Sequence, residues 1–219
     1  MTPTLLAGFL LFAFVSSITP GPNNLMMMAS GVTFGVKRTA PHMAGVCLGF
    51  GLMTLAVGLG VAGVFRAAPW LYIVLRWGAA AYILLLAWRM AKATGVGSAV
   101  TTGEPMSFLG AMGFQWINPK AWVMALGAVT TYARPDRLLS DVALIAALFV
   151  LINIPCSLAW TSSGAAIKRF LKQGRTLRVF NIAMALLLAA SLYPLLTEPL
   201  GGPAAPPKGV ILGTPRTVG

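Results

Sequence analysis

The chain has 219 residues, of which 58% are hydrophobic and only 9% are charged, and its formal net charge is +12. A soluble domain of this size does not bury so apolar a composition, so the sequence predicts an all-α polytopic membrane protein. Most basic residues stand in short connections between apolar segments, which is typical of charges that set membrane topology. We therefore expect the lipid bilayer, and no nucleic acid, as the macromolecular partner.

Hydropathy predicts six transmembrane helices joined mostly by short connections. Their approximate bounds are Thr4–Phe34, Met43–Phe65, Trp70–Met90, Phe108–Tyr132, Val142–Ile167 and Leu177–Leu196. Together they form one transmembrane domain over residues 1–196, with halves of about 1–92 and 107–196. The composition then changes to Pro, Gly and Ala, and we expect a disordered tail over residues 197–219.

The first segment is too long for one straight helix across the bilayer. As a single helix Thr4–Phe34 would measure about 46 Å, against a hydrocarbon core of ~30 Å. The run Pro20-Gly21-Pro22-Asn23-Asn24 in its middle removes backbone donors and permits a non-helical path. Backbone groups freed at membrane depth must be buried in protein or line a wet cavity, so this break predicts a substrate-binding site.

The fourth segment carries a second break, Asn118-Pro119-Lys120. Each half of the chain has three segments, so two related halves would have opposite orientations, as in transporters built from inverted repeats. We expect such a 3+3 inverted repeat, with broken helices one and four meeting near the midplane. Ordinary proline kinks are the alternative interpretation of both breaks.

Lys120 lies near the centre of the fourth segment, where a lysine costs ~2.5–3.5 kcal/mol on insertion. It can donate to backbone carbonyls freed by the breaks, lose its proton, or bind an anionic group of a substrate. We favour a substrate carboxylate held by Lys120 and by the N-terminus of a half-helix. The four acids stand at or beyond the segment ends: Glu104, Asp136, Asp141 and Glu198.

Three asparagines stand beside the breaks: Asn23, Asn24 and Asn118. Each can donate and accept hydrogen bonds, which suits both charged groups of a zwitterion. Capping of helix ends is the alternative role for one or two of them. Two further amides within the segments, Gln115 and Asn153, are interpreted as links between helices.

His42 opens the second segment and is, with Lys120, a candidate for proton coupling, because histidine titrates near neutral pH. A solvated histidine at the membrane interface is the alternative. In the same segment Gly45 and Gly49 permit a close helix approach, either within the chain or in a homodimer.

The basic residues are distributed unequally between the two sides of the predicted bundle. Three follow segments two and four: Arg66, Arg134 and Arg137. Nine follow segments one, three and five: Lys37, Arg38, Arg89, Lys92, Lys168, Arg169, Lys172, Arg175 and Arg178. The connections after helices one, three and five are therefore expected to be cytoplasmic.

Cys47 and Cys156 lie in the second and fifth segments, which correspond under the expected repeat. A membrane thiol relay through these cysteines is therefore the alternative function, although buried inert thiols explain them as well. One histidine and no Cys-x-x-Cys pattern leave no ligand set for a metal, and we expect neither metal nor cofactor. A membrane hydrolase would need a nucleophile–base pattern that is missing, so we expect no enzyme.

The chain resembles the LysE/RhtB family of bacterial amino-acid exporters over about residues 4–196. The matching stretches are Thr19–Asn24, Gly31–Gly35, Pro41–Gly45, Gly78–Tyr82, Phe114–Trp122 and Phe180-Asn181. The resemblance implies a six-helix secondary carrier of the bacterial inner membrane that exports amino acids, driven by the proton gradient. It also implies that the site includes Pro20, Gly21, Pro22, Asn23, Asn118, Pro119 and Lys120.

The positions of the acids narrow the substrate class further. A site without an acid near the midplane is poorly built for a dicationic substrate such as lysine or arginine. We therefore predict a neutral zwitterion, such as threonine, homoserine or an aliphatic amino acid, or a small anion.

Overall fold

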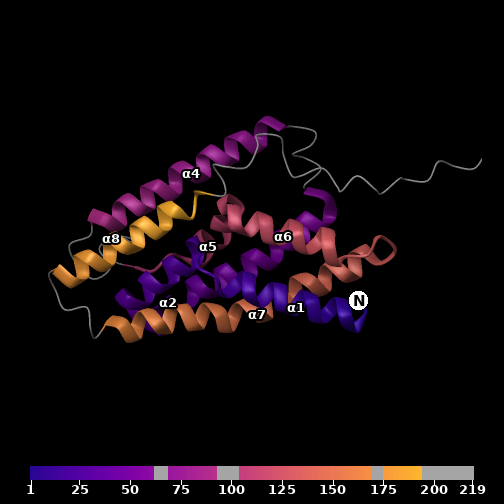
Figure 1. Ribbon diagram of the computed structural model, residues 1–219, viewed down its shortest axis with the longest axis horizontal. Helices are drawn as coiled ribbons and strands as arrows, with labels where there is room; N and C mark the ends of the chain where they lie inside the picture. The colour runs from indigo at the N-terminus through magenta and orange to yellow at the C-terminus, as the bar shows by residue number, and fades with distance from the viewer. Residues whose placement is uncertain (62–68, 93–103, 169–174, 194–219) are drawn as a thin grey trace, which may run out of the picture.

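The computed structural model describes residues 1–61, 69–92, 104–168 and 175–193 of the chain. These residues form helices and connecting turns without a β-strand, which confirms the predicted all-α class (Figure 1). The tail expected over residues 197–219 lies outside the described residues. In chain order the elements are α1 (Pro3–Ile18), α2 (Pro22–Ala56), η1 (Val57–Val61), α4 (Pro69–Lys92), α5 (Phe108–Phe114), η2 (Gln115–Ile117), α6 (Pro119–Tyr132), η3 (Pro135–Arg137), α7 (Leu138–Ile167) and α8 (Arg175–Ala190).

Both predicted helix breaks are present. α1 ends just before Thr19, and α2 begins at Pro22, with Thr19 and Gly21 extended between them. At the second break, α5 continues through the 3-10 turn η2 to an extended Asn118, and α6 begins at Pro119. Each new helix starts with a proline because the first helical position has no intrahelical N–H bond to lose.

A sharp turn at Gly35 divides α2 into two parts. Gly35 has φ +74° and ψ 172°, in a region that glycine adopts without steric cost. The Thr39 hydroxyl donates to the Gly35 carbonyl over 2.8 Å and lies 3.0 Å from the Ser30 hydroxyl. The turn falls between the predicted segments Thr4–Phe34 and Met43–Phe65, so it forms the expected connection between them.

Both parts of α2 pack against α7. Before Gly35 the chain runs toward the C-terminal end of α7, where Lys168 Nζ donates to the Thr33 carbonyl over 3.3 Å. After the turn it runs back, and in η1 Gly58 lies against Val142 near the start of α7. The first two predicted segments are therefore antiparallel.

Glycines bring these helices into backbone contact. A Cβ added to Gly31 or Gly164 would overlap the backbone of the facing helix where α2 crosses α7. Gly45 and Gly49 lie equally close to the backbone of α5. The close approach predicted for Gly45 and Gly49 is thus used within the chain.

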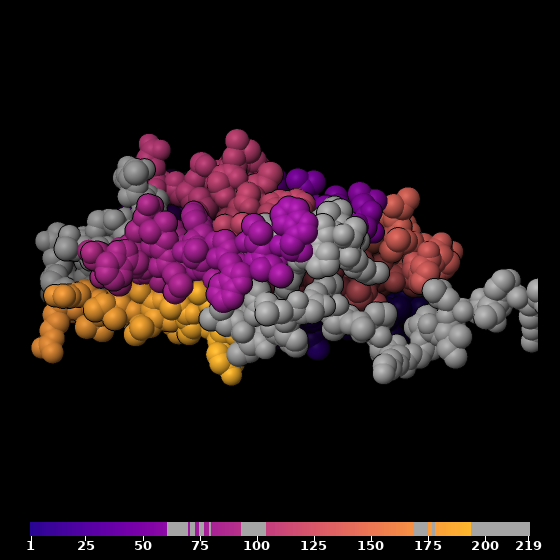
Figure 2. Space-filling view, turned by 90° about the horizontal axis from the view of Figure 1, so that it is seen from above, coloured from indigo at the N-terminus to yellow at the C-terminus, as the bar shows by residue number. Residues whose placement is uncertain are grey.

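Two apolar clusters hold the helices together. Phe149 of α7 packs edge-on against Phe9 of α1 and Phe50 of α2, with ring centroids 5.1 and 4.8 Å apart. The second cluster joins α4 and α8 through buried side chains such as Ile83 and Leu188, and it extends to α2 and α5. α4 and α8 lie side by side along one face of the elongated molecule (Figures 1 and 2).

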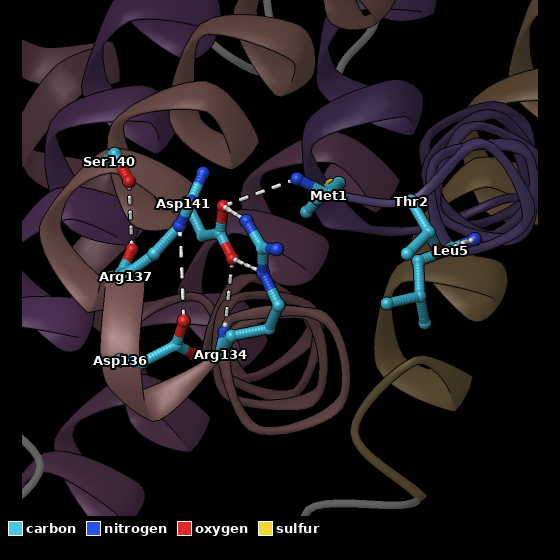
Figure 3. A network of polar contacts seen from close by, with 8 residues as sticks. All are labelled: Met1, Thr2, Leu5, Arg134, Asp136, Arg137, Ser140 and Asp141. Atoms are coloured by element: carbon cyan, nitrogen blue, oxygen red, sulfur yellow. Dashed lines mark hydrogen bonds and ion pairs between the residues drawn. The ribbon is translucent and has the colours of Figure 1, made fainter.

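A buried carboxylate fastens the connection between α6 and α7 (Figure 3). Asp141, in the first turn of α7, accepts hydrogen bonds from Arg134 Nε at 2.7 Å and Nη2 at 3.0 Å. The backbone N–H of Arg134 and the ammonium of Met1 reach the same carboxylate at 3.1 and 3.5 Å. Asp141 thus lies at a helix end, as predicted, and the hydrogen bond to its carboxylate raises the pKa of the Arg134 guanidinium.

The described helices have the character of a membrane protein. Two stretches are long and apolar enough to cross a bilayer, Pro22–Gly60 and Pro135–Ile167, the first of them bent at Gly35. Many large apolar side chains point outward, for example Leu11 of α1 and Leu151 of α7, which are 66% and 62% exposed. Such surfaces suit contact with lipid rather than water.

Candidate functional site

The two helix breaks meet through Lys120. This lysine stands in the first turn of α6, and its ammonium donates to the Thr19 carbonyl at 2.6 Å and to the Thr19 hydroxyl at 3.0 Å. The Pro20 carbonyl lies 3.4 Å away. We call this contact of Lys120 with Thr19 and Pro20 the lysine latch.

The lysine latch corresponds to the first of the three alternatives for Lys120, donation to freed carbonyls. All three ammonium hydrogens have an acceptor within 3.4 Å, so a substrate carboxylate must displace at least one of them. Thr19 was missed as a contributor because its carbonyl, and not its side chain type, supplies the main acceptor. Its place directly before Pro20, at a helix end with free carbonyls, was the available signal.

Gly21 makes room for the lysine side chain. Its backbone is extended, at φ −171°, which other residues adopt equally well. A Cβ added there would lie 2.7 Å from Lys120 Cδ and 3.2 Å from Nζ. Glycine thus leaves space for the close passage of the Lys120 side chain, which would have to shift if a Cβ were present.

The asparagines of the first break have definite partners. Asn23 Nδ2 donates to Gln115 Oε1 at 2.8 Å, and Gln115 Nε2 returns a bond to Asn23 Oδ1 at 3.3 Å. Asn24 Nδ2 donates to the carbonyls of Ser17 and Thr19, each at 2.8 Å. Asn24 thus satisfies the free C-terminal carbonyls of α1, and the interpretation of Gln115 as a link between helices is confirmed.

Asn118 follows the capping alternative. It is buried, and its Oδ1 accepts the backbone N–H of Lys120 at 3.2 Å, which makes it the N-cap of α6. Pro22 and Pro119 begin the helices α2 and α6. The residues predicted for substrate binding therefore come together at the two breaks. Some of them offer side chains to the site, and others cap or begin the helices there.

A small cavity lies between the breaks and the helices α2 and α7. Its volume is about 30 Å³, enough for roughly one water molecule. Among the described residues no acidic side chain lines it, and Lys120 is its one charged group. The lining residues are Ser16, Ser17, Gly21, Asn23, Asn24, Val46, Phe50, Gln115, Asn118, Lys120, Ala121, Met124 and Asn153.

Two of the lining side chains carry polar atoms without a partner among the described residues. They are the Ser17 hydroxyl, in the last turn of α1, and Asn153 Nδ2, in the middle of α7. Both residues are buried, with 5% and 8% of their surface exposed. Asn153 was interpreted as a link between helices, but its amide nitrogen makes no such hydrogen bond among the described residues.

Neither His42 nor the two cysteines line this cavity. His42 is 1% exposed and not at a solvated interface, and neither ring nitrogen has a partner among the described residues. Cys47 and Cys156 are buried free thiols, and Cys47 Sγ lies 3.7 Å from Ser157 Oγ. Within the described parts of the chain, no group of three or more potential metal ligands occurs.

Comparisons with known proteins agree with the resemblance found in the sequence. The chain is 33% identical over 193 residues to the cysteine/O-acetylserine efflux protein of Escherichia coli O1:K1, covering 86% of this chain and 95% of the relative. The protein of the same name from Klebsiella pneumoniae subsp. pneumoniae is 34% identical over 186 residues, covering 81% and 91%. No solved structure matches. The profile of the family described as LysE type translocator matches residues 14–193, and the chain belongs to this family.

Proposed function

We propose that this protein is a secondary transporter that exports small neutral amino acids across the bacterial inner membrane. Its family and the efflux activity in the names of its relatives support a transporter rather than an enzyme. Those relatives are named for cysteine and O-acetylserine, which are small zwitterions, and this agrees with the class expected from the missing midplane acid.

The observation that carries the proposal is the lysine latch. It holds an ammonium 2.6 Å from the carbonyl of Thr19, the residue that follows α1, at a cavity between two broken helices. A zwitterion provides both complementary charges: its carboxylate replaces the carbonyl on Lys120, and its ammonium replaces Lys120 on the carbonyls of Thr19 and Pro20. The exchange leaves no charge in the site unpaired, which a low-dielectric environment requires.

Substrate entry then requires the breaks to separate. A cavity of about 30 Å³ has no room for an amino acid, so the helices around it must move apart before a substrate binds. Because the lysine latch joins the two breaks, its replacement by substrate couples binding to opening. Alternating access by movement of two half-bundles needs such a coupling.

The topology belongs to the same proposal. We propose six passes, arranged as two inverted halves of three. The first half would comprise α1 with the first part of α2, the rest of α2 with η1, and α4; the second half would comprise α5 with α6, α7, and α8. In Figure 1 the C-terminal ends of α4 and α7 and the N-terminal end of α8 lie at one end of the molecule. The basic side chains of these ends support a cytoplasmic location: Arg89, Lys92, Lys168, Arg175 and Arg178.

Proton coupling is assigned to Lys120 or His42. Lys120 takes part in the substrate exchange, so a change in its protonation would alter binding directly. His42 is buried on α2, and both of its ring nitrogens lack a partner among the described residues. Protonation would therefore place an uncompensated positive charge inside the helix bundle.

Efflux from proteoliposomes tests the proposal. Vesicles loaded with threonine, leucine or lysine are compared with and without an imposed pH gradient, for the wild type and for Lys120→Met. Methionine keeps the length of the side chain and removes its charge. We expect the wild type to export threonine or leucine and not lysine, and Lys120→Met to remain folded and inactive.

The variant Lys92→Met is the control, because Lys92 is exposed and stacks on Trp88 at the far end of α4. Normal transport by Lys120→Met would show that the lysine latch is structural. Export of lysine alone would refute the argument from the missing acid.

A further inference from the structure

Ser17 and Asn153 stand out among the polar residues of the cavity because each has a buried side-chain polar atom without a partner among the described residues. Asn23 is paired with Gln115, Asn24 holds helix carbonyls, and Asn118 caps α6. The Ser17 hydroxyl and Asn153 Nδ2 have no partner among the described residues, although both residues are more than nine-tenths buried. Buried polar atoms are nearly always hydrogen-bonded, so two such atoms at one cavity require an explanation.

The two side chains come from helices that frame the cavity. Ser17 belongs to the last turn of α1, directly before the first break, and Asn153 belongs to α7. Both are neutral, and each can donate a hydrogen bond. They suit an uncharged acceptor such as a hydroxyl or ester oxygen, and they could not neutralise an ionised side chain.

We propose that Ser17 and Asn153 form the subsite for a polar group on the β-carbon of the substrate. This inference rests on the proposed function, in which Lys120 and the carbonyls of Thr19 and Pro20 bind the amino and carboxyl groups. The side chain of a bound amino acid then faces the remaining unused donors of the cavity. The carrier therefore prefers serine-like amino acids, with a β-oxygen, over alanine-like ones of nearly the same size.

The preference follows from desolvation. A substrate hydroxyl that leaves water regains hydrogen bonds from Ser17 and Asn153, whereas alanine leaves both donors unsatisfied. A site built to bond a hydroxyl rejects an analogue that lacks it more strongly than an apolar pocket rejects an extra methyl group.

Efflux measurements in proteoliposomes test the subsite. The ratio of serine to alanine efflux is measured for the wild type, Ser17→Ala and Asn153→Leu. We expect the ratio to fall about tenfold in each variant, the effect of one lost hydrogen bond. Ser163→Ala is the matched control, because Ser163 is exposed on α7 and, among the described residues, its hydroxyl donates within its own helix, to the Ala159 carbonyl.

A second variant gives a result that misfolding cannot imitate. Asn153→Asp keeps the size of the side chain and replaces its donor by a carboxylate. We expect it to gain export of 2,3-diaminopropionate, whose side-chain ammonium would pair with the new charge, and to lose the preference for serine.

The outcomes separate the subsite from the proposed function. Equal efflux of serine and alanine by the wild type, or an unchanged ratio in the variants, would overturn the subsite and leave amino-acid export intact. A wild type that moves no amino acid under any gradient would overturn both.

Discussion

Gly21→Ala is expected to open the lysine latch without straining the backbone. The new methyl group would lie 2.7 Å from Lys120 Cδ, and a comfortable carbon–carbon contact needs about 3.7 Å, so the lysine stem must move by about 1 Å. The bonds of 2.6 and 3.0 Å to Thr19 would then lengthen toward the limit of a hydrogen bond. Because Thr19 is exposed, we expect a loss of about 1–2 kcal/mol in the free energy of unfolding.

A double-mutant cycle measures this effect. Unfolding in detergent is followed for Gly21→Ala, Lys120→Ala and the double variant, and amino-acid efflux is measured in parallel. In the Lys120→Ala background the side chain that meets the new methyl group is gone, so Gly21→Ala should cost almost nothing. Gly113→Ala in α5 is the control, since an added Cβ there meets nothing within 4 Å. An equal cost of Gly21→Ala in both backgrounds would refute the reasoning.

Two further predictions follow from groups outside the lysine latch. Asp141→Asn removes the charge that Arg134 binds through two nitrogens, so we expect it to lower the unfolding temperature. Asp136→Asn is the control, because the Asp136 carboxylate is 72% exposed and 3.9 Å from Arg137. Equal unfolding temperatures of the two variants would contradict this prediction. His42→Leu replaces a buried ring with unused nitrogens by an apolar side chain. If His42 couples the proton, efflux of amino acid down its own gradient continues in this variant while the response to an imposed pH gradient disappears; a retained response assigns coupling elsewhere.

The helix breaks could be predicted because proline and glycine act on their own part of the backbone. Pro22 and Pro119 lack the N–H that a continuing helix would use, and both begin new helices in the structure, whereas Pro41 and Pro155 lie inside α2 and α7. The boundary near Phe34 was also well placed, since the basic residues that follow end the apolar run. The exact position of the turn could not be predicted from hydropathy, because it depends on the positive φ of a single glycine, Gly35.

The partners of the site residues could not be predicted in the same way. Lys120 was identified by the cost of its charge, but its acceptor is the carbonyl of Thr19, 101 positions away in the sequence. Every residue carries a carbonyl, and the sequence offers only the place of Thr19 directly before Pro20 as a signal for the one that is used. For the same reason Gln115 and Asn153 looked alike, although the first is paired with Asn23 and the amide nitrogen of the second is unused.

The charge of the site limits the substrates it can take. Lys120 is the charged residue among the described residues that line the cavity, and its partners there are neutral oxygens. A zwitterion adds no net charge, whereas a dicationic amino acid such as lysine adds one positive charge beside the ammonium of Lys120. At a separation of about 5 Å and an effective dielectric constant of about 20, the repulsion amounts to about 3 kcal/mol. This corresponds to roughly a hundredfold weaker binding. The freed carbonyls of Thr19 and Pro20 can bind an ammonium but cannot cancel its charge, so under the proposed function we expect discrimination against lysine to rest on the absence of a carboxylate rather than on the shape of the cavity.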